Sequence, residues 1–436
     1  MEQIGPNILV FLTDQQRWDT AGCYGNEMQL TPNLDAMAGK GVRFRHSFTC
    51  QPVCGPARAS LQTGLYAAAT GVWHNGLALG TDHVTLAKLF NQAGYRTGYI
   101  GKWHLSGTND EPVPEPLRGG YRYWLAADVP EFTSHPYEGI YYDNDNNPVR
   151  FEGYRTDFLT ERAVDFIRRQ ADEPFFLFVS YLEPHQQNDW NRLVAPDGYA
   201  ERYRDCYVPG DLAASESKGD WKEQLPDYYG MCARLDECLG KLLTTLAETG
   251  RAENTIVLFT SDHGCHFRTR NDEYKRSCHE ASIRTPMVFS GPGFRGGATI
   301  DQLVSLVDVP ATLLSAAGLE VPRHMHGRDM MPLVGGSAED WQNEVFLQIS
   351  ESQVGRAIRT ERWKYSAVIP DKEGLQVSAG ELYVDDYLYD LEADPYEQEN
   401  LIGREQYRPI LEKLRQRLKK RIVEAGETEP TIKPAV

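Results

Sequence analysis

The feature that most constrains this fold is a nearly continuous apolar stretch near the start of the chain, residues 7–13. Pro6 precedes the stretch, and the polar residues Asp14-Gln15-Gln16-Arg17 follow it. A strand that is apolar on both faces must be covered on both faces, which is typical of a central strand in a parallel sheet. The carboxyl end of this predicted strand lies at Asp14.

Further predicted strands alternate with predicted helices up to about Gly335. Alternation of this kind indicates an α/β fold, in which a large, mostly parallel sheet is sandwiched by helices. Two long stretches, 106–152 and 186–225, lack periodicity, and we expect them to be loops that form the walls of a pocket. Strands are predicted at 95–100, 175–181, 254–260 and 286–290, and helices at 31–39, 83–92, 156–170 and 231–248.

The pattern of predicted secondary structure changes after Gly335. Four short strand-like runs separated by polar turns predict an antiparallel sheet, and a charged helix is predicted after them at 405–425. We therefore predict a catalytic domain at 1–340 and a smaller α+β subdomain at 341–436. The four runs are residues 345–349, 357–359, 363–368 and 387–391.

The charge balance argues against two classes of partner. The chain of 436 residues has 62 Asp and Glu against 45 Lys and Arg, a formal charge of −17. Nucleic acids and anionic membranes are bound through clustered basic residues, so we expect neither as a partner. No apolar run approaches the roughly 20 residues of a membrane helix.

Localisation is predicted from two further features of the sequence. The first residues contain no basic segment or small-residue cleavage site typical of a signal peptide. The eight cysteines are irregularly spaced and form no disulfide framework. We therefore expect a cytoplasmic protein, unless a leader was removed. The oligomeric state is not predicted.

Polar residues follow several of the predicted strands. In open α/β sheets ligands bind beyond the carboxyl ends of strands. Asp14, His185 and the pair Asp262-His263 each follow a different predicted strand. We therefore expect these side chains to meet in one site.

The most informative segment is Pro52-Val53-Cys54-Gly55-Pro56-Ala57-Arg58-Ala59-Ser60-Leu61-Gln62-Thr63-Gly64. Taken alone, it is a turn that carries a cysteine and leads into a helix. A lone cysteine in such a place is most often a buried structural thiol. Its interpretation changes because other motifs occur with it along the chain.

These other motifs are Gly101-Lys102-Trp103-His104, Ser261-Asp262-His263-Gly264, and Tyr387-Leu388-Tyr389-Asp390-Leu391 with Asp394-Pro395, Glu397 and Asn400-Leu401. With them, the chain resembles the type I sulfatases, the formylglycine-dependent sulfatases of the alkaline phosphatase superfamily. Cys54-x-Pro56-x-Arg58 with Thr63-Gly64 is similar to the motif in which the cysteine is oxidised to formylglycine. The resemblance implies an alkaline-phosphatase-like fold, and it extends over nearly the whole chain.

The resemblance also implies a metal site formed by one divalent cation and five side chains. Oxygen ligands predominate, which favours Ca²⁺, with Mn²⁺ or Mg²⁺ as alternatives. Many relatives have a second Asp at the place of Gln15 and an Asn at the place of His263, and the softer imidazole strengthens the case for Mn²⁺. The implied ligands are Asp14, Gln15, Cys54 after its conversion to formylglycine, Asp262 and His263.

Catalytic roles follow from the matching positions. Arg58 would hold the formylglycine diol and screen the metal site through its permanent charge. Lys102 would bind the diol or a sulfate oxygen. His104 is the candidate base that breaks down the hemiacetal intermediate. His185 and Lys275 would bind the transferring group, one of them as the general acid.

Substrate contacts are predicted with less support. His279, Arg323 and His326 could border the pocket, although a structural role is at least as common for such residues. Residues 138–145 and Trp190 could stack on a sugar face.

The sequence therefore predicts a sulfuric ester hydrolase that acts on a small sulfate ester, a sulfated mono- or oligosaccharide, after maturation by a formylglycine-generating enzyme. Two alternatives stay open. One is a phosphonate monoester or phosphodiester hydrolase, because the Asp14-Gln15 and Asp262-His263 pairs also resemble the branch that contains choline sulfatases and phosphonate monoester hydrolases. The other is a non-catalytic binding protein in which Cys54 stays a thiol.

Overall fold

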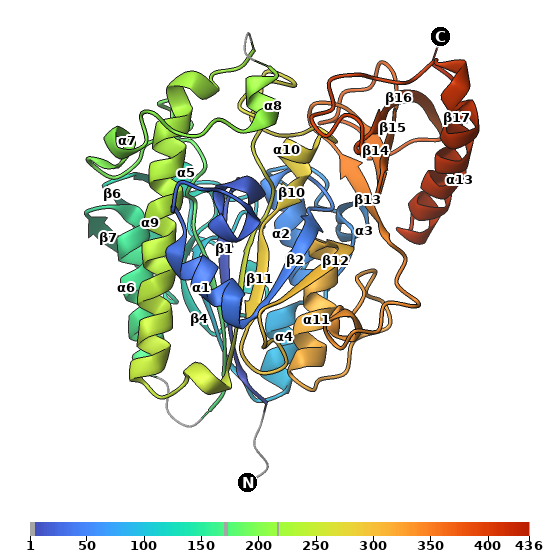
Figure 1. Cartoon of the computed structure of the whole chain (residues 1–436). Coiled ribbons are helices and arrows are strands. Elements are labelled where there is room, and N and C mark those ends of the chain that lie inside the picture. The colour runs from blue at the N-terminus through green and yellow to red at the C-terminus, as the bar shows by residue number, and fades with distance from the viewer. Residues whose placement is uncertain (1–4, 170–172, 216–217, 436) are drawn as a thin grey trace.

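The computed structural model describes residues 5–169, 173–215 and 218–435 (Figure 1). Their strands form a sheet of twelve strands and a separate sheet of five. In Figure 1 the five-stranded sheet and the last helix lie together at one side of the molecule, coloured orange to red. The predicted α/β fold with a smaller C-terminal α+β part is confirmed. The predicted boundary at residue 340 lies just before the five-stranded sheet and stays a prediction.

Five parallel strands form the centre of the large sheet, in the order β9-β1-β8-β3-β4. The strand β1 is buried along its whole length, as its continuous apolar sequence predicts. In register, Ile8 pairs with Phe176 on one side and with Ile256 on the other. The bounds are β1 Asn7–Thr13, β3 Arg96–Lys102, β4 Tyr123–Ala127, β8 Phe175–Ser180 and β9 Thr255–Ser261.

Antiparallel strands extend both edges of this sheet, which is therefore mixed. On one side β11 pairs with β9 and β2, β10 pairs with β2, and β12 runs parallel to β2. The strand predicted at 286–290 is thus confirmed as β11, but it runs antiparallel to its neighbours. The bounds are β2 Val42–Phe48, β10 Arg284–Thr285, β11 Met287–Ser290 and β12 Ala298–Ser305.

The opposite edge corrects the sequence analysis. The stretch 106–152 was expected to be loop, but it supplies β4 and the edge strands β5, β6 and β7. Both β5 and β7 pair with β6 in antiparallel fashion. An edge ribbon with one face exposed tolerates polar residues, so its strands lack the apolar signal of the central ones. The bounds are β5 Ser134–His135, β6 Glu138–Tyr142 and β7 Pro148–Glu152.

Helices cover both faces of the large sheet. Alternate residues of β1 enter two separate cores, because successive side chains of a strand point to opposite faces. Leu9 and Phe11 pack with residues of α1, α6 and α9, whereas Ile8, Val10 and Leu12 pack with residues of α2, α4 and α11. The bounds are α1 Pro32–Lys40, α2 Cys54–Thr63, α4 Leu86–Gln92, α6 Arg155–Arg168, α9 Trp221–Glu248 and α11 Val309–Ala316.

Several helix boundaries differ from the predictions. Helix α9 begins at Trp221, ten residues before the predicted start, and contains Pro226. Trp221, Leu225 and Tyr228 are buried, so tertiary packing outweighs the helix-breaking tendency of the proline. Helix α4 begins three residues later than predicted. The predicted end of α6, at residue 170, lies outside the described residues.

The C-terminal part agrees with its prediction. The strands β13, β14, β15 and β16 pair antiparallel in sequence order, and β17 adds a parallel edge. Helix α13 packs on this sheet through Leu414, Leu418 and Ile422. The bounds are β13 Glu344–Ile349, β14 Gly355–Thr360, β15 Trp363–Val368, β16 Leu382–Asp390, β17 Thr431–Lys433 and α13 Arg408–Glu424.

Short helices complete the fold. Two of them, α7 and α8, lie in the stretch 186–225 that was expected to be loop. None of the described helices combines the length and the apolarity needed to cross a membrane. The short α-helices are α3 Ala67–Thr70, α5 Pro130–Thr133, α7 Tyr199–Arg202, α8 Gly210–Ala213, α10 Glu280–Ile283 and α12 Met331–Val334. The 3₁₀ turns are η1 Trp18–Thr20, η2 Gly22–Tyr24, η3 Glu115–Leu117, η4 Ala252–Asn254, η5 Leu306–Asp308 and η6 Glu405–Tyr407.

Candidate active site

The ends of β1 and β9 bring two carboxylates together. Thr13 pairs with Ser261 in register, so Asp14 and Asp262 follow at neighbouring strand ends. The backbone N–H of Gln15 donates to Asp262 Oδ1 over 3.1 Å. Gln15 has φ of 71°, a left-handed backbone that is uncommon for a residue with a side chain. The strand ends meet here as the sequence predicts.

Cys54 is the first residue of α2 and faces this strand edge. Its Sγ lies 3.2 Å from His263 Nε2, 3.1 Å from Lys275 Nζ and 3.5 Å from Asp14 Oδ1. Asp14, Cys54, Asp262 and His263 form the Cys54 cluster, in which one ligand atom of each residue lies within 4.8 Å of the others. All four residues are buried.

The donor set of the Cys54 cluster fits one divalent cation. His263 Nδ1 lies 3.0 Å from the carbonyl oxygen of Gly264, so the ring donates there and its Nε2 lone pair faces the cluster. The side-chain amide nitrogen of Gln15 donates to Gln186 Oε1, and Gln15 Oε1 accepts from Lys275 Nζ over 3.2 Å. An amide oxygen, two carboxylates and an imidazole nitrogen are established ligands of hard to borderline cations.

The electrostatic surroundings of Cys54 differ from those of the other cysteines. Burial alone would raise the pKa of its thiol, but Lys102, Lys275 and His263, with a hydrogen bond from His104, hold the pKa well below the usual value of 9.0. The seven other cysteines all lie among the described residues, and burial raises the pKa of each. Cys54 is therefore the thiol that this protein surrounds with positive charge.

Two buried cations connect α2 and β3 to the cluster. Arg58 Nη2 donates to Asp14 Oδ2 and its Nε to Asp262 Oδ2, each over 3.1 Å. Lys102 Nζ lies 2.8 Å from Asp14 Oδ2. Burial raises the energy of a carboxylate, yet Lys102 and its neighbours hold the pKa of Asp14 well below its usual value. Burial and the nearby Asp14 charge raise the pKa of Asp262.

The remaining predicted catalytic residues lie at the same edge of the sheet. His104 follows β3, has φ of 60° and is buried, and its Nδ1 has no hydrogen-bond partner among the described residues. His185 is buried and its Nδ1 lies 2.8 Å from the carbonyl oxygen of Gln186. Lys275 is also buried. The structure thus brings all the predicted catalytic and metal-ligating residues to one place, while their roles stay predictions.

Glu131, at the start of α5, was missed by the sequence analysis. Its Oε1 lies 2.7 Å from Lys102 Nζ and 3.8 Å from His185 Nδ1. Its Oε2 is buried and has no hydrogen-bond partner among the described residues. Burial opposes ionisation, but Lys102 and His185 keep the pKa of Glu131 below its usual value. No sequence motif marks Glu131, and the stretch that contains it was expected to be loop.

Glu351 was also missed, and it connects the C-terminal part to the edge of the site. Its Oε1 accepts from the backbone N–H of Asn75 over 2.7 Å, and its Oε2 lies 2.6 Å from Arg276 Nη2. Asn75 Oδ1 in turn accepts from the backbone N–H of Gly55, next to Cys54. Arg276 follows Lys275, and Arg276 and Glu351 both have left-handed backbones, with φ of 70° and 65°.

Two of the three residues predicted to contact substrate make other contacts in this structure. His279 Nε2 lies 3.2 Å from the hydroxyl of Tyr389. His326 Nδ1 accepts from the backbone N–H of Tyr66 over 3.1 Å, and Arg323 is exposed. Their part in substrate binding stays a prediction.

The predicted aromatic contacts with a sugar also stay a prediction. Trp190 is 47% exposed and stacks on the His135 ring with 4.7 Å between centroids. Residues 138–142 of the predicted contact region form β6, so they belong to the sheet edge and not to a free loop.

Comparison with known proteins gives two matching family models. The model described as Sulfatase matches residues 6–319, and the model described as N-sulphoglucosamine sulphohydrolase, C-terminal, matches residues 272–424. Together they extend from β1 to the end of α13. The first match contains every residue of the Cys54 cluster.

Individual relatives agree with the family models. The chain is 32% identical to an ulvan-active sulfatase of Formosa agariphila, over 98% of this chain and 83% of that protein. It is 26% identical to an N-acetylglucosamine-6-O-sulfatase of Bacteroides thetaiotaomicron, over 99% and 88%. A solved structure of a sulfatase from Bacteroides fragilis, described as putative, superposes with a TM-score of 0.83 at 25% identity and covers 98% of this chain and 97% of that one. Sulfate ester hydrolysis fits these findings better than phosphonate hydrolysis.

Proposed function

The chain belongs to the sulfatase family and is a sulfuric ester hydrolase, and we propose that it uses a formylglycine made from Cys54 to hydrolyse a small sulfated saccharide. The observation that supports this most is the Cys54 cluster. A buried thiol at the first position of a helix faces two carboxylates and an imidazole nitrogen, with Lys102 and Lys275 beside them. A purely structural cysteine has no need of such neighbours.

We propose that Asp14, Gln15, Asp262, His263 and the matured side chain of residue 54 hold one divalent cation, with Ca²⁺ preferred and Mn²⁺ or Mg²⁺ as alternatives. When bound, the cation supplies charge that offsets the nonbridging oxygens of the ester, and hydrated formylglycine supplies the hydroxyl nucleophile. Maturation requires a formylglycine-generating enzyme as a partner. All eight cysteines are free, which suits the reducing cytoplasm that we propose as its location.

The other side chains of the site are proposed to neutralise charge and to move protons. Arg58 holds Asp14 and Asp262 in place through two separate nitrogen atoms, and Lys102 adds a second positive charge. Lys275 Nζ lies beside Cys54 Sγ, where it can donate to an oxygen of the transferring sulfate. His185 is proposed as the acid that protonates the leaving alcohol, and His104 as the base of the second step.

The substrate class is proposed from the relatives. An ulvan-active sulfatase and an N-acetylglucosamine-6-O-sulfatase both act on sulfated carbohydrates. The reacting groups of this chain are buried, so a compact ester at the end of a saccharide suits the site better than one in the interior of a polymer. Which sugar and which sulfated position it accepts are decided by residues around the site, such as Asn75 and Arg276.

Two measurements test this proposal. Protein produced with a formylglycine-generating enzyme should give a Cys54 peptide whose mass shows an aldehyde oxygen in place of the thiol, and it should hydrolyse p-nitrophenyl sulfate in the presence of a divalent cation. Turnover of p-nitrophenyl phenylphosphonate should be much slower. A Cys54 peptide that always retains its sulfur, or a large preference for the phosphonate, would overturn the proposal. A panel of regioisomeric sulfated monosaccharides then identifies the substrate.

A further inference from the structure

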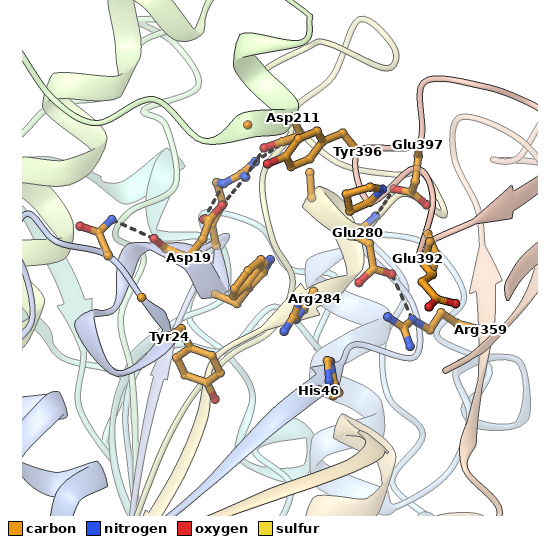
Figure 2. A pocket seen from close by; sticks show the side chains of 18 of the residues that line it. Asp19, Tyr24, His46, Asp211, Glu280, Arg284, Arg359, Glu392, Tyr396 and Glu397 are labelled. Carbon is orange, nitrogen blue, oxygen red and sulfur yellow. Dashed lines mark hydrogen bonds and ion pairs between the residues drawn. The ribbon is translucent and has the colours of Figure 1, made fainter. Parts of the chain in front are cut away.

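A second candidate site is a cavity of about 550 Å³, shown in Figure 2. Its walls come from the turns η1 and η2, from α10 and from residues 391–397 of the C-terminal part. No residue of the Cys54 cluster lines it, nor do Arg58, Lys102 or Lys275. We call it the Arg284 pocket.

One corner of the Arg284 pocket is formed by His46, Arg284 and Arg359 (Figure 2). The guanidinium carbon of Arg284 lies 3.7 Å from the ring centroid of Trp18, and its Nη2 donates to the carbonyl oxygen of Arg45. Arg284 Nε and His46 Nδ1 are both buried and have no hydrogen-bond partner among the described residues. Buried nitrogen atoms without partners are costly, so this corner has unused capacity to bind an acceptor.

The carboxylates of the pocket are largely committed to other cations. Asp19 and Asp211 lie 2.6 and 2.7 Å from the Arg17 guanidinium. Glu280 and Glu397 lie 2.8 and 2.5 Å from Lys364 Nζ. Arg359 shares Glu280 at 3.3 Å, but the ion pairs of the described residues include none for Arg284.

The pKa of His46 reflects the positive charge of the two arginines at this corner. Burial, followed by the charges of Arg284 and Arg359, lowers its pKa to about 3. Burial also lowers the pKa of Arg284; the charge of Glu280 opposes this shift, and the charge of Arg359 adds to it. The ring of His46 is therefore neutral near pH 7, and it can donate one hydrogen bond without adding to the charge.

We propose that the corner formed by His46, Arg284 and Arg359 binds a sulfate group, either as the free ion or as part of a sulfated saccharide. Two guanidinium groups and an imidazole from three different elements can each meet a different oxygen of a tetrahedral anion. The choice of sulfate among oxyanions rests on the proposed function, which releases it. Tyr207 and Tyr396, 52% and 45% exposed, also line the pocket and offer faces on which a sugar can stack.

A crystal soaked in selenate tests the site directly, because selenate has the shape and charge of sulfate and gives an anomalous signal. We expect a selenium peak within hydrogen-bond distance of Arg284 in the wild-type protein and no peak there in Arg284→Gln. The matched control is Arg295→Gln, since Arg295 is exposed and paired with Glu253 outside the pocket. This control should keep the peak. A wild-type crystal with selenate at the Cys54 cluster and none at Arg284 would overturn the proposal.

Binding in solution separates the two sources of sulfate. Resonances of the His46 ring are followed by NMR during titration with sodium sulfate, glucosamine 6-sulfate or glucosamine. Arg284→Gln should weaken sulfate binding at least tenfold, and Arg284→Lys, which keeps the charge, should weaken it less. A response to both sulfated compounds indicates the free ion as a sufficient ligand, and a response to the sulfated sugar alone indicates a glycan subsite. An equal response to glucosamine would refute the proposal.

Sulfate binding at Arg284 can be tested separately from sulfatase activity. Arg284→Gln should retain its thermal unfolding temperature within a few degrees and its turnover of p-nitrophenyl sulfate. If the protein lacks sulfatase activity but still binds sulfate at Arg284, the proposed function fails and this inference stands.

Discussion

Two buried groups of charged side chains lie at the two ends of the segment that joins Lys275 to α10, and they differ in whether atoms that can ligate a metal converge. The first is the Cys54 cluster with Arg58, Lys102 and Lys275. The second is the Lys364 network, in which Lys364 Nζ contacts Glu280 Oε1 and Glu397 Oε1, and Glu397 Oε2 accepts from the backbone N–H of Glu280. In the Lys364 network each charge has a partner of opposite sign.

The comparison separates a structural use of buried charge from a chemical one. The Lys364 network joins the C-terminal sheet to α10, and its geometry is complete in the protein alone. In the Cys54 cluster a thiol, two carboxylate oxygens and an imidazole nitrogen converge within 4.8 Å. Ligand atoms that converge in this way stabilise a fold poorly unless a cation binds between them. We therefore infer that the Cys54 cluster is arranged to bind a cation and to catalyse a reaction.

Replacing Cys54 should separate the two groups most strongly. We expect Cys54→Ala to reduce kcat/KM for p-nitrophenyl sulfate by more than about 10³-fold, because nucleophilic catalysis depends on this position. The free energy of unfolding should change little, since removing the thiol relieves the crowding of anionic groups. Steady-state kinetics and chemical denaturation measure the two quantities.

Cys50→Ala is the matched control for this variant. Cys50 is buried four residues earlier, and burial raises the pKa of its thiol to about 11. We expect a modest loss of stability and nearly normal turnover. Equal losses of activity in the two variants would show that this segment is merely sensitive to substitution.

Removal of divalent cations should affect only the first group. Treatment with EDTA should lower turnover by at least about 100-fold, because the proposed cation supplies charge that offsets the nonbridging oxygens of the ester. It should also lower the unfolding temperature, since a cation that binds only the folded state stabilises it. Adding back Ca²⁺, Mn²⁺ or Mg²⁺ separately should restore both readouts and identify the preferred ion. An unchanged unfolding temperature and full activity in EDTA would contradict the metal site.

Breaking the second group should cost stability and leave the chemistry intact. Lys364→Met leaves Glu280 and Glu397 buried without their shared cation, and we expect a loss of about 3–5 kcal/mol in the free energy of unfolding. Without the cation the pKa of both carboxyls rises in the folded state. The loss should therefore grow as the pH rises above the ordinary glutamate pKa of 4.5.

Lys420→Met is the control for this prediction. Lys420 is 66% exposed and pairs with Glu424 on the surface of α13, so its loss should cost less than about 1 kcal/mol at any pH. Urea denaturation at several pH values measures both variants. A pH-independent loss in Lys364→Met would show that packing of the lysine stem outweighs its charge.

The same comparison shows which features the sequence could predict. Central strands such as β1 are apolar throughout, and the residues that follow them are carried to one edge by the topology of a parallel sheet. Asp14, Asp262 and His263 could therefore be predicted from local sequence, and Cys54 and Lys102 from a family motif. Glu131 and Glu351 could not, because each lies in a segment without periodicity and acts through partners more than 25 residues away. The edge strands β5 to β7 escaped prediction because one exposed face removes their apolar signal.

The smallest expected effect tests whether the C-terminal part contributes to the site. Glu351→Gln keeps an oxygen that can accept from the Asn75 N–H but loses the charge that pairs with Arg276. Arg276 would retain Glu273 at 3.0 Å and would be held less firmly next to Lys275. We expect kcat/KM for a sulfated monosaccharide to fall about three- to tenfold, mainly through KM, with little change for p-nitrophenyl sulfate. Glu405→Gln is the control, because Glu405 is exposed, pairs with Arg408 and does not line the Arg284 pocket. An equal loss with both substrates would show that Glu351 positions the reacting groups and does not recognise the sugar.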